Sequence, residues 1–213
     1  MKNLKQVITT LLLVGLTQIM VSQTTTSAKI GVKGGVNFSN LYVDNVDDNN
    51  MLTGFNLGLF AKVPITKFFS VQPEIYYTGK GSELTYNNFF ATGTAKFKLN
   101  YIEVPVLAVI NITESINIHA GPYMAYLING KVTNESNVTL FNFANDLKTE
   151  DFNRFDAGLA VGAGLDFDSL SLGVRYNYGL SQVGKERNIG GNNFTYPDGK
   201  NSVFNIYAAF SFN

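Results

Sequence analysis

Hydrophobic and polar residues alternate with a period of two over most of the chain beyond residue 29, a pattern typical of β-strands. In Leu170–Leu180, every even position holds Leu, Val or Tyr, and every odd position holds Ser, Gly, Arg or Asn. Phe155–Phe167 alternates in the same way, with its largest apolar residues at odd positions. We therefore predict eight strands: Ile30–Leu41, Leu52–Pro64, Phe69–Gly81, Phe97–Ile110, Ile116–Ile128, Phe155–Phe167, Leu170–Leu180 and Val203–Phe212.

The connections between these strands alternate between short and long. The short ones are tight turns: Ile65–Phe68, Thr113–Ser115 and Asp168–Ser169. The long ones are polar and rich in Asn: Tyr42–Met51, Leu84–Lys96, Asn129–Arg154 and Ser181–Ser202. All tight turns therefore lie at one end and all long loops at the other, as in outer-membrane barrels with short periplasmic turns and long extracellular loops. The pattern predicts an all-β fold, an eight-stranded antiparallel up-and-down transmembrane β-barrel.

The positions of charged residues support the same fold, because they fall on the face of each strand opposite the apolar residues. The polar residues expected to line the barrel interior are Lys33, Lys62, Gln72, Glu74, Glu103, His119, Asp156 and Arg175. An eight-stranded barrel is just wide enough for side chains to fill it. Opposite charges are expected to pair there, since an unpaired buried charge is costly. We favour a hydrogen-bonded plug, and the alternative is a polar conduit for small solutes.

Aromatic residues gather toward both ends of the apolar face, which a soluble β-sandwich would not require. Those toward the long loops are Phe38, Phe55, Tyr77, Tyr126, Phe155, Tyr178 and Phe204. Those toward the tight turns are Phe69, Phe167 and Phe212. Two aromatic girdles at the membrane interfaces are a feature of outer-membrane barrels. We predict that these residues form such girdles.

One predicted strand, Phe97–Ile110, departs from simple alternation. Its apolar residues up to Tyr101 stand at odd positions, whereas those from Ile102 onward stand at even positions. A β-bulge inserts one extra residue into a strand and would bring both sets to the same face. The sequence therefore predicts a bulge near Tyr101.

The first residues read as a secretory signal. Lys2 and Lys5 precede a largely apolar run, Val7–Val21, which is shorter and more polar than the roughly 20 apolar residues of a membrane-spanning helix. We predict cleavage after Ser22, a short segment over residues 23–29 and a barrel over residues 30–213. The predicted location is the cell outer membrane, and an uncleaved N-terminal anchor is the alternative.

Composition excludes several other classes of protein. The 213 residues include no Cys, which rules out disulfides, a thiol nucleophile and a thiolate metal site. The 16 basic and 16 acidic residues balance, so binding to nucleic acid through phosphate neutralisation is not expected. We predict no cofactor and no metal. The acidic residues Asp44, Asp47 and Asp48 lack the Gly and Glu of an EF-hand loop and indicate a solvated loop.

His119, the only histidine, is the one candidate catalytic base. It follows the tight turn Thr113–Ser115 and faces inward, away from the loop rim where a substrate would arrive, so we predict that the protein is not an enzyme. The long loops also contain aromatic residues: Phe141, Phe143, Phe152, Phe194 and Tyr196. These residues either anchor a protein partner or extend the strands above the membrane as hairpins, and both interpretations stay open.

Five segments together resemble a known family: Gly31–Ser39, Gly54–Ala61, Val71–Gly81, Tyr101–Leu107 and Ala120–Tyr123. They are similar to the outer-membrane β-barrel proteins of Bacteroidetes, often called PorT-type or porin-family proteins, and the resemblance covers Ile30–Asn213. It implies a barrel in contact with the lipid of a Gram-negative outer membrane, inserted by the barrel-assembly machinery. It implies little about activity, although some members are linked to protein secretion and gliding.

Taken with the residue pattern, the resemblance leads to one expected function and one alternative. We predict a closed, monomeric barrel whose extracellular loops bind a protein partner or support envelope and secretion functions. The alternative is a narrow porin-like channel for small solutes.

Overall fold

The computed structural model of the chain describes residues 27–42, 49–87, 92–138, 142–146, 152–189, 192–195 and 199–212. The predicted signal segment 1–22, the acidic residues Asp44, Asp47 and Asp48, and the loop residues Phe141 and Tyr196 lie outside these described residues. No helix among the described residues is long and apolar enough to cross a membrane.

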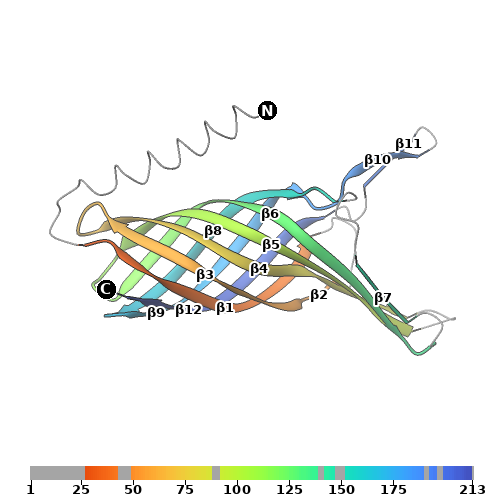
Figure 1. Ribbon diagram of the computed structural model, residues 1–213, viewed down its shortest axis with the longest axis horizontal. Coiled ribbons are helices and arrows are strands. Elements are labelled where there is room, and N and C mark those ends of the chain that lie inside the picture. Colours follow the sequence, from red (N-terminus) through yellow and green to blue (C-terminus); the bar gives the residue numbers. More distant parts are fainter. Residues whose placement is uncertain are drawn as a thin grey trace.

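Eight of the described strands close into an antiparallel ring, which confirms the predicted up-and-down barrel (Figure 1). Each pairs with its neighbour along the chain, and the first and last strands of the ring pair with each other. They are β1 (Lys29–Tyr42), β3 (Leu52–Pro64), β4 (Phe69–Asn87), β5 (Thr92–Asn111), β6 (Ile116–Ser136), β8 (Phe155–Phe167), β9 (Leu170–Gln182) and β12 (Lys200–Ser211).

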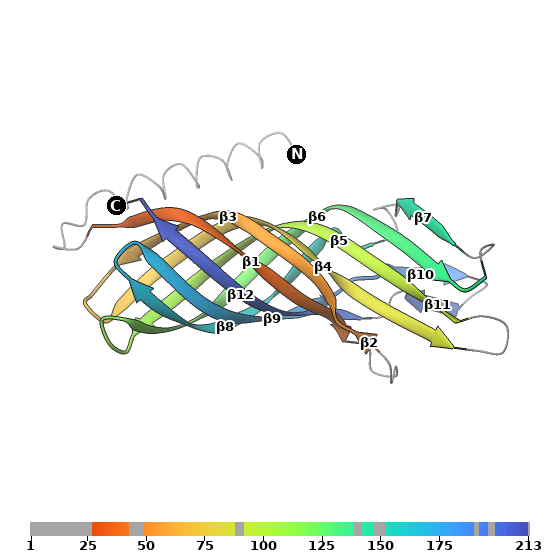
Figure 2. The same ribbon diagram turned by 90° about the horizontal axis from the view of Figure 1, so that it is seen from below.

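Four of the described strands are short and lie at the end of the barrel that carries the long connections. Asn49–Asn50 (β2) pairs with β4, and Phe143–Asp146 (β7) pairs with β6. Glu186–Ile189 (β10) and Asn192–Thr195 (β11) form a separate hairpin, which contains Phe194. We call this end of the barrel the loop end and the opposite end the turn end. Figures 1 and 2 show the short strands gathered at the loop end.

Three strands are much longer than their sequence pattern predicted. β4, β5 and β6 have 19, 20 and 21 residues, whereas β3, β8 and β9 have 13 each. Parts of the predicted loops Leu84–Lys96 and Asn129–Arg154 are therefore strand. For Leu84–Lys96 the loop prediction was wrong, whereas the pairing of β7 with the extended β6 agrees with the alternative that Asn129–Arg154 continues the strands as a hairpin. The extra length projects beyond the rest of the barrel (Figure 2). A segment with neither face in lipid has no need of apolar residues on one side, so its alternation is weak.

The turn end is closed by the three predicted tight turns. Ile65 N–H donates to the carbonyl of Phe69 at 2.9 Å, and Ile112 N–H donates to the carbonyl of Ile116 at 2.8 Å. Between β8 and β9 the turn is only two residues long, and Asp168 adopts a φ of 35°. Asp is one of the few residues other than Gly that tolerate this left-handed conformation.

The outer surface of the barrel is apolar. Leu57, Val161 and Phe155 are 61%, 56% and 73% exposed, an arrangement suited to contact with lipid tails. All ten residues predicted to form aromatic girdles lie in the outward phase of their strands: Phe38, Phe55, Tyr77, Tyr126, Phe155, Tyr178, Phe204, Phe69, Phe167 and Phe212. Two pairs of rings are in contact, Phe55 with Tyr77 at 5.7 Å and Tyr126 with Phe155 at 5.2 Å between centroids.

The irregularity predicted near Tyr101 is present, but it lies on the neighbouring strand. Tyr101 pairs with Leu127 and Asn100 pairs with Asn129, so Ile128 of β6 is the extra residue. Inward and outward side chains alternate along β5 without a break. Leu99 and Tyr101 point into the barrel and are 1% and 0% exposed. The prediction that a bulge brings these residues to the lipid face was wrong. It assumed that apolar residues face outward, whereas this part of the interior is apolar.

Candidate functional site

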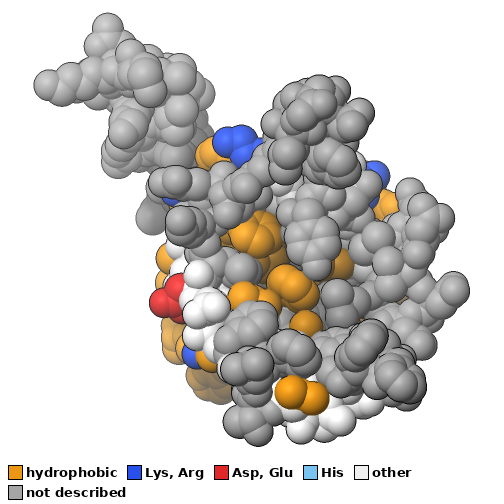
Figure 3. Space-filling view, turned by 90° about the vertical axis from the view of Figure 1, so that its right-hand side faces the viewer, with side chains coloured by type: hydrophobic (Ala, Val, Ile, Leu, Met, Phe, Trp, Pro, Cys, Tyr) orange, Lys and Arg blue, Asp and Glu red, His pale blue; other side chains and the backbone are white. Residues whose placement is uncertain are grey.

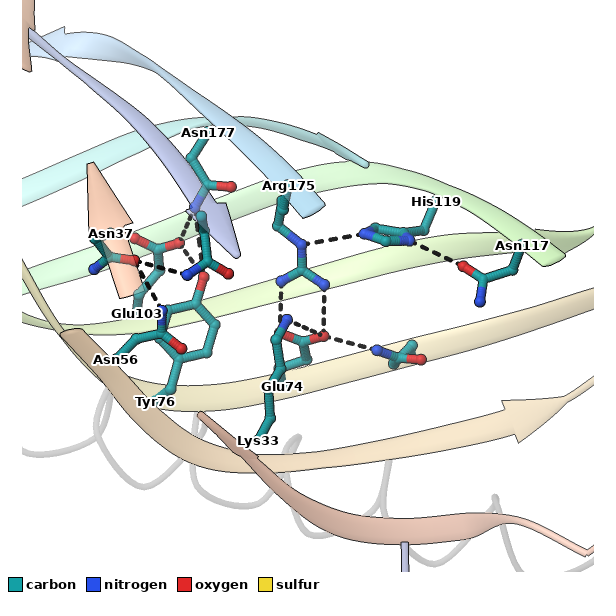
Figure 4. A network of polar contacts seen from close by, with 12 residues as sticks. Lys33, Asn37, Asn56, Glu74, Tyr76, Glu103, Asn117, His119, Arg175 and Asn177 are labelled. Carbon is teal, nitrogen blue, oxygen red and sulfur yellow. Dashed lines mark hydrogen bonds and ion pairs between the residues drawn. The ribbon is translucent and has the colours of Figure 1, made fainter. Parts of the chain in front are cut away.

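The described charged side chains of the barrel interior meet in three clusters, the first of which is built around Glu74 of β4 (Figure 4). Arg175 of β9 donates two hydrogen bonds to its carboxylate, from Nη1 at 2.7 Å and from Nη2 at 2.8 Å. Lys33 of β1 lies 3.1 Å from the same carboxylate, and Gln72 Nε2 donates to it at 2.7 Å. Lys33, Glu74 and Arg175 are all buried. One carboxylate therefore binds two cations that come from different strands, which leaves this cluster with one excess positive charge.

His119 extends this first cluster toward the turn end. Arg175 Nε donates to His119 Nε2 at 3.3 Å, so His119 Nε2 acts as an acceptor. The other ring nitrogen, Nδ1, then carries the proton and donates to Asn117 Oδ1 at 3.1 Å. Both nitrogens of this buried ring are thus used in orienting Arg175 (Figure 4). The arrangement is structural, since the base of a catalytic triad needs a free nitrogen directed at a nucleophile.

The second cluster lies closer to the loop end and is centred on Lys80 of β4. Lys80 Nζ is 2.5 Å from Glu103 Oε2 and 3.2 Å from Asp156 Oδ2. Tyr76 Oη and Asn177 Nδ2 donate to the other oxygen of Glu103 at 2.5 and 2.6 Å. The ammonium also lies 4.6 Å from the centre of the Tyr123 ring, a cation–π contact. A single lysine here balances two carboxylates, the reverse of the first cluster.

The third cluster lies at the turn end of the barrel. Lys62 Nζ is 2.8 Å from Asp166 Oδ2, and the two side chains are 16% and 24% exposed. Asn117 Nδ2 donates to the same Asp166 oxygen at 2.9 Å, and Ser171 Oγ donates to the other at 2.7 Å. Through Asn117, this cluster is continuous with His119 and the first one.

The three clusters together are electrically neutral. Their cations are Lys33, Lys62, Lys80 and Arg175, and their carboxylates are Glu74, Glu103, Asp156 and Asp166. The structure brings every sequence-predicted interior residue into one of them: Lys33, Lys62, Gln72, Glu74, Glu103, His119, Asp156 and Arg175. No group of acidic or histidine side chains suited to a metal ion occurs within the described ranges.

Several members of the clusters were not among the predicted site residues. Lys80 and Asp166 stand on the polar face of their strands and could have been chosen from the alternation alone. Tyr76, Tyr123 and Tyr207, whose ring centre lies 3.8 Å from Lys33 Nζ, were harder to predict, because a tyrosine counts as apolar in a hydrophobic pattern. Their positions in the alternating pattern could have identified them, since Tyr76 lies on the same face of its strand as Glu74.

An apolar layer covers the second cluster on its loop-end side. Five buried side chains form it, and we call them the apolar lid: Leu41, Leu99, Leu127, Phe152 and Val183. Backbone hydrogen bonds hold its last two members in place, from Asn153 N–H to the Val183 carbonyl at 3.0 Å and from Val183 N–H to the Gly199 carbonyl at 2.8 Å. Phe152 is only 8% exposed, so the hypothesis that it is an exposed anchor for a partner was wrong. Figure 3 shows hydrophobic side chains in the middle of the loop end.

Close packing against His119 leads to a prediction about Gly162 of β8. A Cβ atom at Gly162 would lie 2.5 Å from His119 Nε2 and 2.4 Å from the Val174 carbonyl oxygen. Gly162→Ala is therefore expected to displace His119 and to lower the free energy of unfolding by about 1 to 3 kcal/mol, as overpacking does elsewhere. Urea unfolding in lipid vesicles measures this difference. Gly34→Ala is the matched control, because a Cβ there meets nothing closer than 3.4 Å. Equal losses in the two variants would contradict the prediction.

The chain is similar to known outer-membrane proteins in sequence and in fold. A family model described as an outer membrane protein β-barrel domain matches residues 21–184. The solved structure of Neisserial surface protein A is similar over 88% of this chain and 100% of that one, at 14% identity and a TM-score of 0.52. Ail, the attachment invasion locus protein of Yersinia pestis, solved in complex with the heparin analogue sucrose octasulfate, covers the same shares at 18% identity and a TM-score of 0.48. No protein of curated function matches the sequence.

Proposed function

The chain belongs to the family of outer-membrane β-barrel domains and resides in the outer membrane, and on this premise we propose that it is a closed barrel that presents a binding surface outside the cell. The observation that carries the proposal is the projecting sheet of β4, β5, β6 and β7 on a barrel whose interior is filled. The filled interior argues against transport, and the projecting sheet offers a surface for a partner.

The contents of the interior support a closed barrel. The clusters around Glu74 and Lys80 join side chains from opposite walls, so they cross the space that a solute would need. Their charges are mutually neutralised, which leaves no excess charge to attract an ion. The apolar lid adds a layer of hydrophobic side chains on their loop-end side. A permeating solute would have to break buried ion pairs, and breaking one typically costs several kcal/mol.

The projecting sheet supports partner binding. β4 and β5 remain paired from Ser82 and Phe97 up to Asn87 and Thr92, beyond the level where β1 and β3 end. On the other side of β5, β6 continues to Ser136 and is joined by β7. A sheet that projects beyond the rest of the barrel exposes both backbone edges and side chains, which are the elements used in strand-mediated recognition.

The same proposal includes several finer points that the sequence suggested. The barrel acts as a monomer, and its ring, which closes within one chain, needs no strand from a second copy. It performs no catalysis, and it reaches the membrane through its signal segment and the barrel-assembly machinery. Its motifs from Gly31–Ser39 to Ala120–Tyr123 support a place among the PorT-type and porin-family barrels of Bacteroidetes. The outward aromatic residues form two girdles at the membrane interfaces.

Conductance in a planar lipid bilayer tests the closed barrel. The refolded chain is expected to insert without producing discrete current steps, because buried ion pairs cross the interior of the barrel. Folding is checked first by its faster migration on a gel when it is not boiled. Discrete open steps whose ion selectivity changes on charge reversal at Glu74 or Arg175 would overturn the closed barrel and establish the narrow channel.

Shortening the projecting hairpin tests the binding surface. Glu83 and Lys96 are register partners, so an Asn-Gly turn can join them in place of residues 84–95 without disturbing the barrel. A photo-crosslinking residue is placed on intact cells at Glu135, on the projecting sheet, or at Ile118, on the lipid face. A protein adduct of defined mass at Glu135, absent at Ile118 and lost in the shortened variant, is expected. The absence of any protein adduct at Glu135 would overturn the proposed surface.

A further inference from the structure

Two lysines face each other on the outer surface where the barrel continues into the projecting sheet. Lys98 of β5 and Lys131 of β6 are direct register partners, and both side chains are exposed. In an antiparallel pair, directly opposed side chains have Cβ atoms about 5 Å apart, and like charges in this position destabilise the sheet. The arrangement therefore calls for a negative partner near both ammonium groups.

The described part of the chain does not supply that partner. Neither Lys98 nor Lys131 forms an ion pair with a carboxylate of the described residues, although Asp146 of β7 lies opposite Lys131 in the register. The nearby Lys96 is different, since its Nζ lies 3.7 Å from Glu83 Oε2. With respect to the described residues, the two ammonium groups are therefore available to an added anion.

The lysine pair stands just above the lipid-facing surface. Below it on β6 lie the exposed side chains of Tyr126 and Ile128, and Tyr126 packs against Phe155 of β8. Lys131 follows Tyr126 by five residues, but Ile128 is the bulge residue, so the two differ by four steps of the ladder. Four steps place Lys131 roughly 10 Å farther out for a strand rise of about 3.3 Å and a tilt of about 40°. If the aromatic residues lie at the edge of the apolar band, the long lysine side chains can bend back from that height to place their ammonium groups among the lipid headgroups. The guanidinium of Arg154, which donates to Tyr126 Oη at 3.2 Å, adds a positive charge to the same surface.

We propose that Lys98 and Lys131 bind a phosphate group of the lipid in the outer leaflet, the phosphorylated glucosamine headgroup of lipid A. Continuity with the lipid-facing surface favours a lipid over a soluble protein, because a ligand held here has its acyl chains against Ile128 and Tyr126. Phosphate also offers several oxygen acceptors to two ammonium groups at once. The site fixes the height and rotation of the barrel in the leaflet, and it is independent of any partner bound by the projecting sheet.

The test is a titration of the refolded full chain in detergent micelles, followed by native mass spectrometry. The probes are diphosphoryl lipid A, its dephosphorylated counterpart and inorganic phosphate. At about 1 kcal/mol for each basic residue near an anionic lipid surface, Lys98→Gln and Lys131→Gln are each expected to raise the Kd for diphosphoryl lipid A about 5-fold, and both together about 30-fold. Asp146→Asn is expected to lower that Kd, because it removes the nearest register carboxylate.

Matched controls make the outcome decisive. Lys67→Gln removes an exposed lysine at the turn end and is expected to leave the Kd unchanged. Migration of unboiled samples on a gel confirms that every variant is folded. An unchanged Kd in the double variant would overturn the proposal, and so would equal binding of the dephosphorylated lipid. Displacement of lipid A by inorganic phosphate at stoichiometric concentration would also overturn it, since the site would then select free phosphate.

Discussion

Glu74→Gln is expected to lower the free energy of unfolding by about 3 to 5 kcal/mol, the usual cost of removing one partner from a buried ion pair. The reason is that Glu74 is the carboxylate in contact with both Arg175 and Lys33, and all three side chains are buried. Glutamine keeps the shape of the side chain but leaves two cations without a counter-charge inside the barrel. Urea unfolding of the refolded chain in lipid vesicles, followed by tyrosine fluorescence and gel migration, measures the loss.

Glu83→Gln is the matched control for this experiment. It makes the same chemical change in an ion pair with Lys96 that is 3.7 Å long and partly exposed. Such pairs contribute less than about 1 kcal/mol. A second variant, Glu74→Gln with Lys33→Met, removes one of the two uncompensated charges and is expected to recover part of the loss. Equal stability of Glu74→Gln and Glu83→Gln would show that the interior pairs do not hold the barrel together.

Lys80→Met is expected to destabilise the barrel by about 3 to 5 kcal/mol or more, because it leaves two buried carboxylates with no cation between them. Glu103 and Asp156 both lie within 3.2 Å of Lys80 Nζ in the folded protein. Without the lysine they repel each other, and the carbon chain of methionine cannot relieve that repulsion. The fraction of protein that inserts into lipid vesicles, and its unfolding midpoint in urea, report the effect.

A triple variant distinguishes whether the stability loss of Lys80→Met comes from charge repulsion or from packing. Combining Lys80→Met with Glu103→Gln and Asp156→Asn removes all three charges and is expected to restore most of the lost stability, since neutral replacements of buried ion groups are often well tolerated. Lys67→Met, at an exposed turn, serves as the control for the substitution itself. A triple variant no more stable than Lys80→Met alone would assign the loss to packing.

The barrel was predictable from the sequence because lipid outside and ion pairs inside impose opposite chemistry on alternate residues. β3 and β8 begin and end where the alternation predicted, at Leu52–Pro64 and Phe155–Phe167. The signal weakens wherever this contrast is lost. Thr92–Lys96 has neither face in lipid, and Leu99 and Tyr101 meet an apolar patch inside the barrel. The extension of β4, β5 and β6 and the location of the bulge on β6 were therefore not predicted, because in both places the two faces of the strand do not differ in polarity.

The residues of the interior clusters were largely predictable, but their pairing was not. Alternation identifies Glu74 and Arg175 as inward, yet they are 101 residues apart and stand on strands that are not neighbours in the ring. Their contact depends on how far each strand is staggered against the next, which the pattern of single residues does not contain. The same stagger brings Lys80 between Glu103 and Asp156.

The pairing of β1 with β12 has a consequence for how the barrel folds. Gly31 pairs with Ser211, and Phe212 N–H donates to the carbonyl of Ile30 at 2.9 Å, so ring closure joins positions about 180 residues apart. All other pairs in the ring join strands that follow each other in the chain and can form as local hairpins. The last seam carries the largest loop-closure entropy, and until it forms both edge strands expose unpaired backbone groups. Closure of this seam is therefore the expected slow step of folding, and a template that occupies both edges would accelerate it.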